Sequence, residues 1–166
     1  MIVVSDTSPL CNLAIANHLW LLQAIYGNVV IPEVVASELA NAQDLPDVQS
    51  ILTLDWIQIS SLTNVDLATQ LERDRNLDPG EAAAIALAVE LQADDLLIDE
   101  RLGRQEALSL GLSVIGILGI LLVAKQRRLI QDIQPVLDVL INQANFYVSD
   151  RLYNQILKAA GEEDMP

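Results

Sequence analysis

The chain has 166 residues and carries 23 Asp and Glu against nine Lys and Arg, a formal net charge of −14. A protein that grips many phosphates usually presents a basic face, so this balance excludes broad, non-specific contact with duplex DNA. The single cysteine, Cys11, excludes an internal disulfide and fits a reducing compartment. The most apolar run, residues 114–124, is shorter than the about 20 residues of a bilayer span, and the opening MIVVSDTS lacks a basic leader. We therefore expect a cytoplasmic protein without a membrane partner.

Short apolar strands alternate with helical segments through the first half of the chain. Residues 2–5 read as a strand, and Ser8 followed by Pro9 predicts a helix start, with helix to residue 26 that breaks near Asn17 and His18. The remaining elements predicted here are a strand at 29–31, a helix opened by Pro32, helix at 47–54, a strand at 56–59 and a helix at 66–75.

The second half continues the alternation. Asp78-Pro79-Gly80-Glu81 is an acidic opening for an Ala-rich helix that runs to Leu91. The elements predicted after it are strands at 96–98 and 113–115, helices at 101–109, 118–125, 133–143 and 150–159, and an edge strand at Tyr147-Val148. Short strands without polar interruptions, alternating with helices, indicate a mostly parallel central sheet flanked by helices, which is a three-layer α/β fold. We expect one domain over residues 1–161 and an acidic C-terminal tail over 162–166.

Four acidic residues stand where a predicted strand ends or a helix begins. They are Asp6, Glu38, Glu81 and Asp99. A parallel sheet gathers its strand ends at one edge, so carboxylates far apart in sequence can meet there. Clustered carboxylates suit a hard cation such as Mg²⁺ or Mn²⁺, and a metal held in this way points to phosphoryl chemistry.

Each of these acids also has a purely structural explanation. Asp6 could begin an Asx-turn, and Glu38 could be a polar position on an amphipathic helix. Glu81 follows Asp78 by three residues, as in a capping box, and Asp99 with Glu100 could pair with nearby arginines. The functional interpretation depends on all four reaching the same edge of the sheet.

Several segments resemble the PIN domains, a family of metal-dependent ribonucleases that includes VapC-type toxins. They are the opening VSDTSPLCNLA, the helix GEAAAIALA, and LLIDERLGRQEA followed by VIGILGILLVAK. The resemblance covers nearly the whole chain and is closest to a VapC-like bacterial and archaeal branch. It implies a PIN-like fold and a metal-dependent nuclease activity.

The resemblance also implies roles for individual residues. Asp6, Glu81 and Asp99 would hold one metal ion, and Glu38 would position a second metal or the attacking water. Ser8 matches a small polar residue that steadies the carboxylates. The segment Glu100-Arg101 with Gly103-Arg104 departs from the pattern of many PIN toxins, which leaves open whether Glu100 joins the metal site.

We therefore expect a Mg²⁺- or Mn²⁺-dependent endoribonuclease with RNA as substrate. Arg101, Arg104 and Lys125 are candidates for binding flanking phosphates, although a salt bridge is the better explanation for at least one of the arginines. A homodimer is expected, because the hydrophobic content of 52% leaves apolar surface, for example around Ile51–Leu54 or Leu118–Val123.

Two other classes of function stay open. The chain could be a catalytically weak, toxin-like interaction module that mainly binds an antitoxin protein or a second copy of itself. It could also be a Mg²⁺-dependent phosphohydrolase that acts on small substrates. Cleavage of RNA that depends on Asp6 would favour the nuclease over both.

Overall fold

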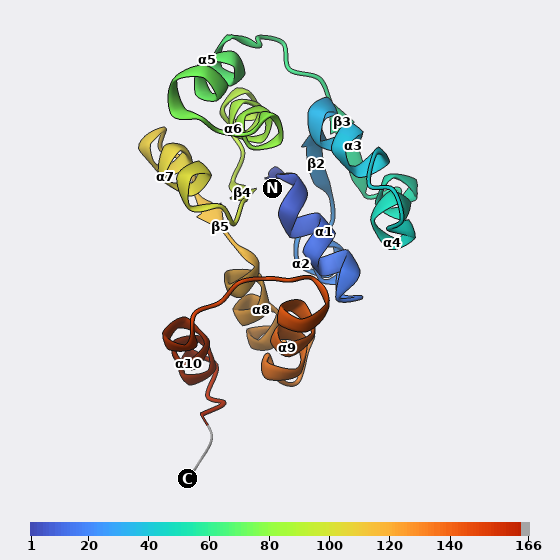
Figure 1. Ribbon diagram of the computed structural model, residues 1–166, viewed down its shortest axis with the longest axis vertical. Helices are drawn as coiled ribbons and strands as arrows, with labels where there is room; N and C mark the ends of the chain where they lie inside the picture. Colours follow the sequence, from blue (N-terminus) through green and yellow to red (C-terminus); the bar gives the residue numbers. More distant parts are fainter. Residues whose placement is uncertain (164–166) are drawn as a thin grey trace.

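A five-stranded sheet in which every strand pair is parallel forms the centre of the computed structural model, which describes residues 1–163. Its order is β3-β2-β1-β4-β5. The strands are β1 (Val3–Ser5), β2 (Val29–Pro32), β3 (Ile57–Ser60), β4 (Asp95–Leu97) and β5 (Val114–Ile115). Helices cover the sheet, which confirms the predicted three-layer α/β architecture (Figure 1).

The helices follow the predicted order closely. Three of them, α5 (Asp66–Arg75), α7 (Arg101–Ser109) and α10 (Asp150–Ala159), have the predicted bounds. The others are α1 (Thr7–Ile15), α2 (Trp20–Tyr26), α3 (Glu33–Ala40), α4 (Pro46–Gln49), the 3-10 helix η1 (Ser50–Thr53), α6 (Pro79–Leu91), α8 (Ile117–Gln126) and α9 (Gln134–Gln143). The predicted break near Asn17 separates α1 from α2, and Asn17 has a positive φ of 58°.

Along the strands, successive side chains belong alternately to two hydrophobic cores. Val3 belongs to the core that includes buried side chains from α1, α2, α3, α8, α9 and α10. Its neighbour Val4 belongs to a second core formed with α5, α6 and α7. This is the period-two alternation of a strand buried on both faces. In Figure 1, α5–α7 lie on one side of the strands and α1–α4 on the other.

The strand order reverses direction at the centre of the sheet. The chain moves outward from β1 through β2 to β3, and then returns to place β4 on the other side of β1. Ser5 is in register with Leu97, and the backbone N–H of Asp6 donates to the carbonyl of Leu97 at 3.0 Å. In open parallel sheets, ligands bind beyond the carboxyl ends of the strands where the order reverses. The fold therefore directs attention to the residues that follow β1 and β4.

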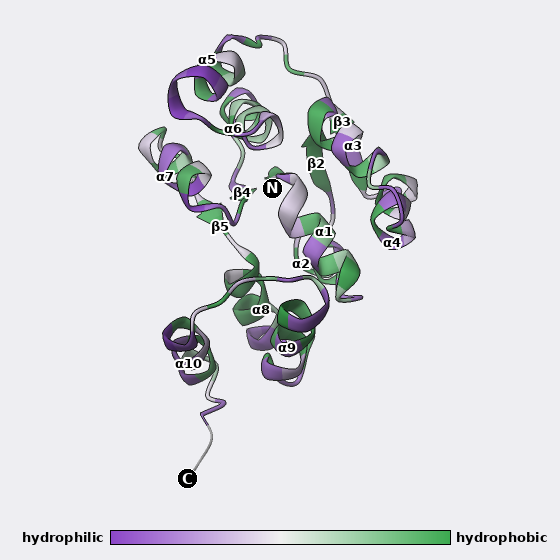
Figure 2. Ribbon diagram, viewed as in Figure 1, coloured by the Kyte–Doolittle hydropathy of each residue, from purple (hydrophilic) through white to green (hydrophobic). Residues whose placement is uncertain are grey.

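Two helices carry much of the apolar surface that closes the cores. Nine residues of α6 are buried, most of them alanine, which allows the helix to pack closely on the sheet. The segment ILGILLVAK of α8 buries Ile117, Ile120, Leu121 and Ala124. In Figure 2, α8 is mostly green, which marks hydrophobic residues, and large parts of α5 are purple, which marks hydrophilic ones. The enclosed helix α8 is therefore more apolar than α5, which lies at the periphery.

Two local predictions were wrong. Helix α1 begins at Thr7 with Asp6 as its N-cap residue, so Ser8 is inside the first turn and is not the cap. Tyr147 and Val148 form no strand; they belong to the connection between α9 and α10, where Tyr147 is 86% exposed. An additional edge strand would have to pair with β5, which is only two residues long and offers little backbone for pairing.

The apolar surfaces that we expected to be left over are partly covered within the chain. Ile51 is fully buried, and Leu52 and Leu54 pack against the same core. In the stretch 118–123, Ile120 and Leu121 are fully buried and Leu118 and Leu122 pack against that core. Leu52, Leu54, Leu118 and Leu122 stay partly exposed, so these segments offer only narrow apolar strips to a second chain. None of the helices in residues 1–163 combines the length and apolarity needed to span a bilayer.

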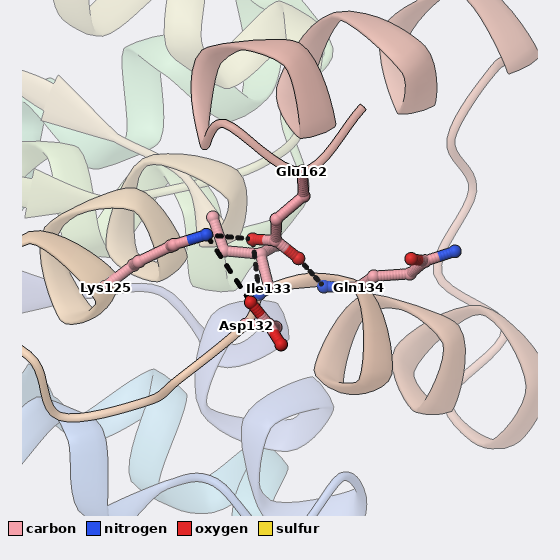
Figure 3. Close-up of polar contacts among 5 residues, drawn as sticks. All are labelled: Lys125, Asp132, Ile133, Gln134 and Glu162. Atoms are coloured by element: carbon pink, nitrogen blue, oxygen red, sulfur yellow. Dashed lines mark hydrogen bonds and ion pairs between the residues drawn. The ribbon is translucent and has the colours of Figure 1, made fainter. Parts of the chain in front are cut away.

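The carboxylate of Glu162 ties the end of the chain to the start of α9 (Figure 3). It accepts hydrogen bonds from the backbone N–H groups of Ile133, at 2.7 Å, and Gln134, at 3.0 Å. It also lies 2.8 Å from the ammonium of Lys125, which is 3.6 Å from Asp132. Glu162, the first residue of the predicted acidic tail, is thus bonded to the domain, while residues 164–166 lie outside the described residues.

Replacing Glu162 with Gln should lower the free energy of unfolding by about 1–2 kcal/mol, because a charged acceptor of two backbone N–H groups and one ammonium is lost. Burial alone would raise the pKa of Glu162, but the bonds from Lys125, Ile133 and Gln134 outweigh it and lower the pKa. The contribution should therefore be present at neutral pH and disappear as the pH falls through the lowered pKa.

Urea unfolding at pH 7 and in acid measures this loss. Glu163→Gln is the matched control, because the neighbouring glutamate is exposed. Equal stability of the two variants at pH 7 would contradict a role for Glu162 in holding the end of the chain.

Candidate metal centre

Asp6 directly follows β1 and is only 2% exposed. Its backbone is extended, as at an N-cap, but its side chain accepts no capping hydrogen bond from α1. A cap or Asx-turn therefore does not account for this aspartate. A carboxyl group that is buried without such a bond needs another reason to be there, since burying an unpaired charge is costly.

The surroundings of Asp6 strongly favour its protonated form in the absence of a cation. Burial raises the pKa of Asp6 to about 8, and the nearby charges of Glu81, Asp78 and Glu38 push it in the same direction. The adjacent backbone N–H of Thr7 works in the opposite direction without reversing the shift. Desolvation together with like charges is the signature of a carboxylate cluster.

Glu81 lies in the first turn of α6 and is 5% exposed. Its backbone N–H donates to the Asp78 carboxylate at 2.9 Å, and the backbone N–H of Asp78 in turn lowers the pKa of the Glu81 carboxyl. Both halves of a capping box are thus in place. Nevertheless burial, assisted by Asp78, Glu100 and Glu38, raises the pKa of Glu81 to about 7. Glu81 serves the helix start and the acidic cluster at once.

Glu38 reaches the cluster from α3, the helix after β2. The hydroxyl of Thr7 donates a short hydrogen bond to its carboxylate. The same carboxylate lies over the start of α6, where a Cβ on Gly80 would come within 2.6 Å of Oε2 and 2.7 Å of Oε1. A side chain at position 80 would displace the Glu38 carboxylate from this place.

Asp99 follows β4 by two residues and faces the start of α8. Its Oδ1 accepts a hydrogen bond from the backbone N–H of Ile117 at 3.0 Å, while its Oδ2 is buried and has no hydrogen-bond partner. A Cβ on Gly116 would lie 2.5 Å from Oδ1 and 2.8 Å from Nη1 of Arg104. Burial raises the pKa of Asp99, although the Ile117 N–H and Arg104 both oppose the shift.

The structure brings Asp6, Glu38 and Glu81 within electrostatic range of one another, and Asp99 stands to one side. Glu100 acts on both Glu81 and Asp99 and so lies between the two groups. The field of Asp6 and Glu38 also reaches Cys11, whose pKa burial raises to about 11. Within residues 1–163, however, no three His, Cys, Asp or Glu side chains are arranged closely enough to hold one metal ion.

The residues predicted to support the acids lie around the cluster rather than within it. Ser8 lines a hollow beside Asp99, but the hydroxyl that contacts the cluster is that of Thr7. Arg101 is exposed beside the same hollow, and the guanidinium of Arg104 donates to the carbonyl of Ile98 at 3.1 Å. Lys125 is eight residues beyond Ile117, about 12 Å along α8, and its ammonium is paired with Glu162.

Sequence reasoning missed two contributors, Thr7 and Gly80. The signal for Thr7 was in the opening SDTS, where Thr and Ser are equally good polar neighbours of Asp6. Gly80 was read only as part of a helix start, because its role depends on Glu38, which is distant in sequence.

The chemistry of the donor set fits a hard divalent cation. The nearby side-chain donors are carboxylate oxygens, which Mg²⁺ and Mn²⁺ prefer, and Oδ2 of Asp99 is a buried acceptor without a partner. The pKa values of Asp6 and Glu81 are raised by burial and like charge, which a bound cation would reverse. The side chains would have to move closer together to share one ion.

A family model described as DUF3368, a PIN domain, matches residues 2–162. The chain belongs to this PIN-domain family. No curated protein matches the sequence. PIN domains are generally nucleases and typically use divalent metal ions.

The free energy of unfolding of this PIN domain should fall as the pH rises in the absence of divalent metal. Asp6 has a folded-state pKa of about 8, above its ordinary value of 3.8, so the folded state binds more protons than the unfolded state between those values. Stability is then highest below about pH 4 for this group and is lost as the pH passes 8, on the order of a few kcal/mol.

Denaturant unfolding in EDTA between pH 5 and pH 9, as approximate limits, measures this slope. Asp6→Asn should flatten it, whereas Asp55→Asn, which changes an exposed aspartate, should leave it as in the wild type. A wild type whose stability is constant or rises over this range would show that Asp6 is not a buried, protonated acid.

Proposed function

We propose that this PIN domain is a metal-dependent endoribonuclease, toxin-like in character, that hydrolyses RNA phosphodiester bonds. The observation that carries the proposal is the pair of buried carboxyl groups, Asp6 and Glu81, with strongly raised pKa values where the strand order reverses. Structural carboxylates usually have lowered pKa values, because they are paired with cations. Here burial and like charge act together, as at functional sites.

Asp6, Glu81 and Asp99 would hold a Mg²⁺ or Mn²⁺ ion, and Glu38 would orient the attacking water or a second ion. When bound, such an ion lowers the pKa of water and stabilises the charge that grows on the phosphate. Thr7 fixes Glu38 through its hydroxyl, and the Ile117 N–H fixes one oxygen of Asp99 and leaves the other available. Arg104 stands beside Asp99, where it can orient a phosphate next to the scissile bond.

A toxin-like role brings two protein partners into the proposal, a cognate antitoxin and a second copy of the chain. In the segments 51–54 and 118–123, several apolar side chains are buried in the core of the same chain, and the other apolar ones are only partly exposed. Leu102 and Leu108 of α7, at 55% and 57% exposure, are apolar side chains that remain available. Light scattering at a protein concentration of roughly tens of micromolar distinguishes a monomer from a dimer by its mass.

RNA cleavage should require Mg²⁺ or Mn²⁺, stop in EDTA, and be lost in Asp6→Asn and Asp99→Asn. The same metal ions should raise the melting temperature of the wild type, with about 2.7 kcal/mol gained at a hundredfold excess over Kd, and should stabilise Asp6→Asn much less. Gel analysis of labelled RNA and melting curves measure the two effects.

Each outcome separates the proposal from its rivals. Metal-dependent stabilisation without cleavage would identify an interaction module. Turnover of small phosphate esters but not RNA would identify a phosphohydrolase. Equal stabilisation of wild type and Asp6→Asn would contradict the acidic site. Asp55→Asn serves again as the control, since it removes a charge without touching the cluster.

The affinity for RNA should depend only weakly on salt. With Lys125 paired to Glu162, Arg101 and Arg104 are the candidates left for phosphate contacts, so about two counterions should be released. For a single strand this corresponds to a slope of log affinity against log salt of roughly −1.4. Filter binding over a range of KCl concentrations measures it, and a slope several times steeper would mean that a partner supplies basic surface.

A further inference from the structure

Two hollows flank Asp99 and share an aromatic wall. One, of about 480 Å³, is lined by Asp99, Arg104 and Gly116, and the other, of about 340 Å³, by Asp99, Arg101 and Ser8. Phe146 and Tyr147, from the connection between α9 and α10, line both. Each volume is within the range of small-ligand sites.

Tyr147 has no structural reason to be where it is. Its side chain is 86% exposed, the highest exposure among the large hydrophobic side chains of the described residues. An aromatic ring left in water contributes nothing to the hydrophobic stability of the fold. Phe146 beside it is half-buried and packs against the core, so the connection is anchored while the ring of Tyr147 is presented to solvent.

The charge of the protein limits how it can hold RNA near Asp99. The net charge of −14 repels a polyanion, and only Arg101 and Arg104 line the two hollows as cations. Stacking of a base on an aromatic ring needs no net positive charge and is tolerant of sequence. Tyr147 lines both hollows and its side chain is 86% exposed, so its ring is accessible to a base there.

We propose that Tyr147, supported by Phe146, is a stacking platform for an unpaired nucleobase of the RNA at the Asp99 site. The inference rests on the proposed nuclease function and adds the residue that holds the base. A base inside a duplex has both faces covered by its neighbours and cannot lie on the ring, whereas a single strand can turn a base outward. Arg101 and Arg104 then face the phosphates on either side of that base.

The test is fluorescence anisotropy of a labelled oligouridine, of the same strand with abasic sugars, and of a blunt RNA duplex, each with Ca²⁺ as the divalent ion. Tyr147→Ala should bind oligouridine roughly five- to a hundredfold more weakly than the wild type. Tyr147→Phe should bind it within about twofold of the wild type, because the ring is kept. The abasic strand and the duplex should bind weakly to all three proteins.

Trp20→Ala is the matched control, since Trp20 is an aromatic residue at 45% exposure that lines a hollow elsewhere, beside Asp47 and Trp56. It should not change the affinity. An unchanged melting temperature of Tyr147→Ala will show that its fold is intact.

Equal affinity of Tyr147→Ala and wild type, equal affinity for single strand and duplex, or no binding of oligouridine by the wild type would each overturn the inference. Cleavage assays with Mn²⁺ keep it apart from the proposed function. Cleavage that is independent of Tyr147 leaves the nuclease standing without the platform. Tyr147-dependent binding without cleavage leaves the platform standing without the nuclease.

Discussion

The proposed site depends on acidic side chains that are buried at the point where the sheet reverses its strand order. Asp6 is 2% exposed and Glu81 is 5% exposed, and the groups that act on their pKa values are other acids and backbone N–H groups rather than Lys or Arg. A buried carboxylate without a cation must keep its proton or acquire a counter-charge. Asp6 and Glu81 therefore lack a cationic partner among residues 1–163. Gly80 and Gly116 leave room for the carboxylates of Glu38 and Asp99, and Thr7 donates a hydrogen bond to Glu38.

The elements that the sequence predicted well are those whose ends are marked by local chemistry. The helices over 66–75, 101–109 and 150–159 have polar residues at both ends and an amphipathic pattern between them, so their bounds could be read directly. The position of the acids followed from a general property of parallel sheets, in which strand ends meet at one edge. Which of the acids lie close to one another could not be predicted from the sequence. Asp99 turns toward the N–H of Ile117, a contact across 18 residues that no local pattern reveals.

Other expectations were altered by contacts that composition does not reveal. A content of 52% hydrophobic residues predicts leftover apolar surface, but much of α8 and of the segment 51–54 packs against the core of the same chain. Lys125 stays a candidate phosphate ligand, but its ammonium is paired with Glu162, which is 37 residues away in sequence. Tyr147-Val148 has strand-forming residues, but strand formation needs a partner edge, and β5 is too short to provide one.

An acidic protein and a polyanionic substrate are compatible when the negative charge is concentrated at a cation site. A divalent ion bound among Asp6, Glu81 and Asp99 would offset local charge where a phosphate must approach, without any change to the rest of the surface. The cations in the hollows around Asp99 are few, so the remaining selectivity has to come from shape and from apolar contact. The acids and the aromatic residues come from two different parts of the chain. The strand ends of the sheet supply the acids, and the connection between α9 and α10 supplies the aromatic wall beside them. The packing of α9 and α10 on the core thus places that connection beside Asp99, which follows β4.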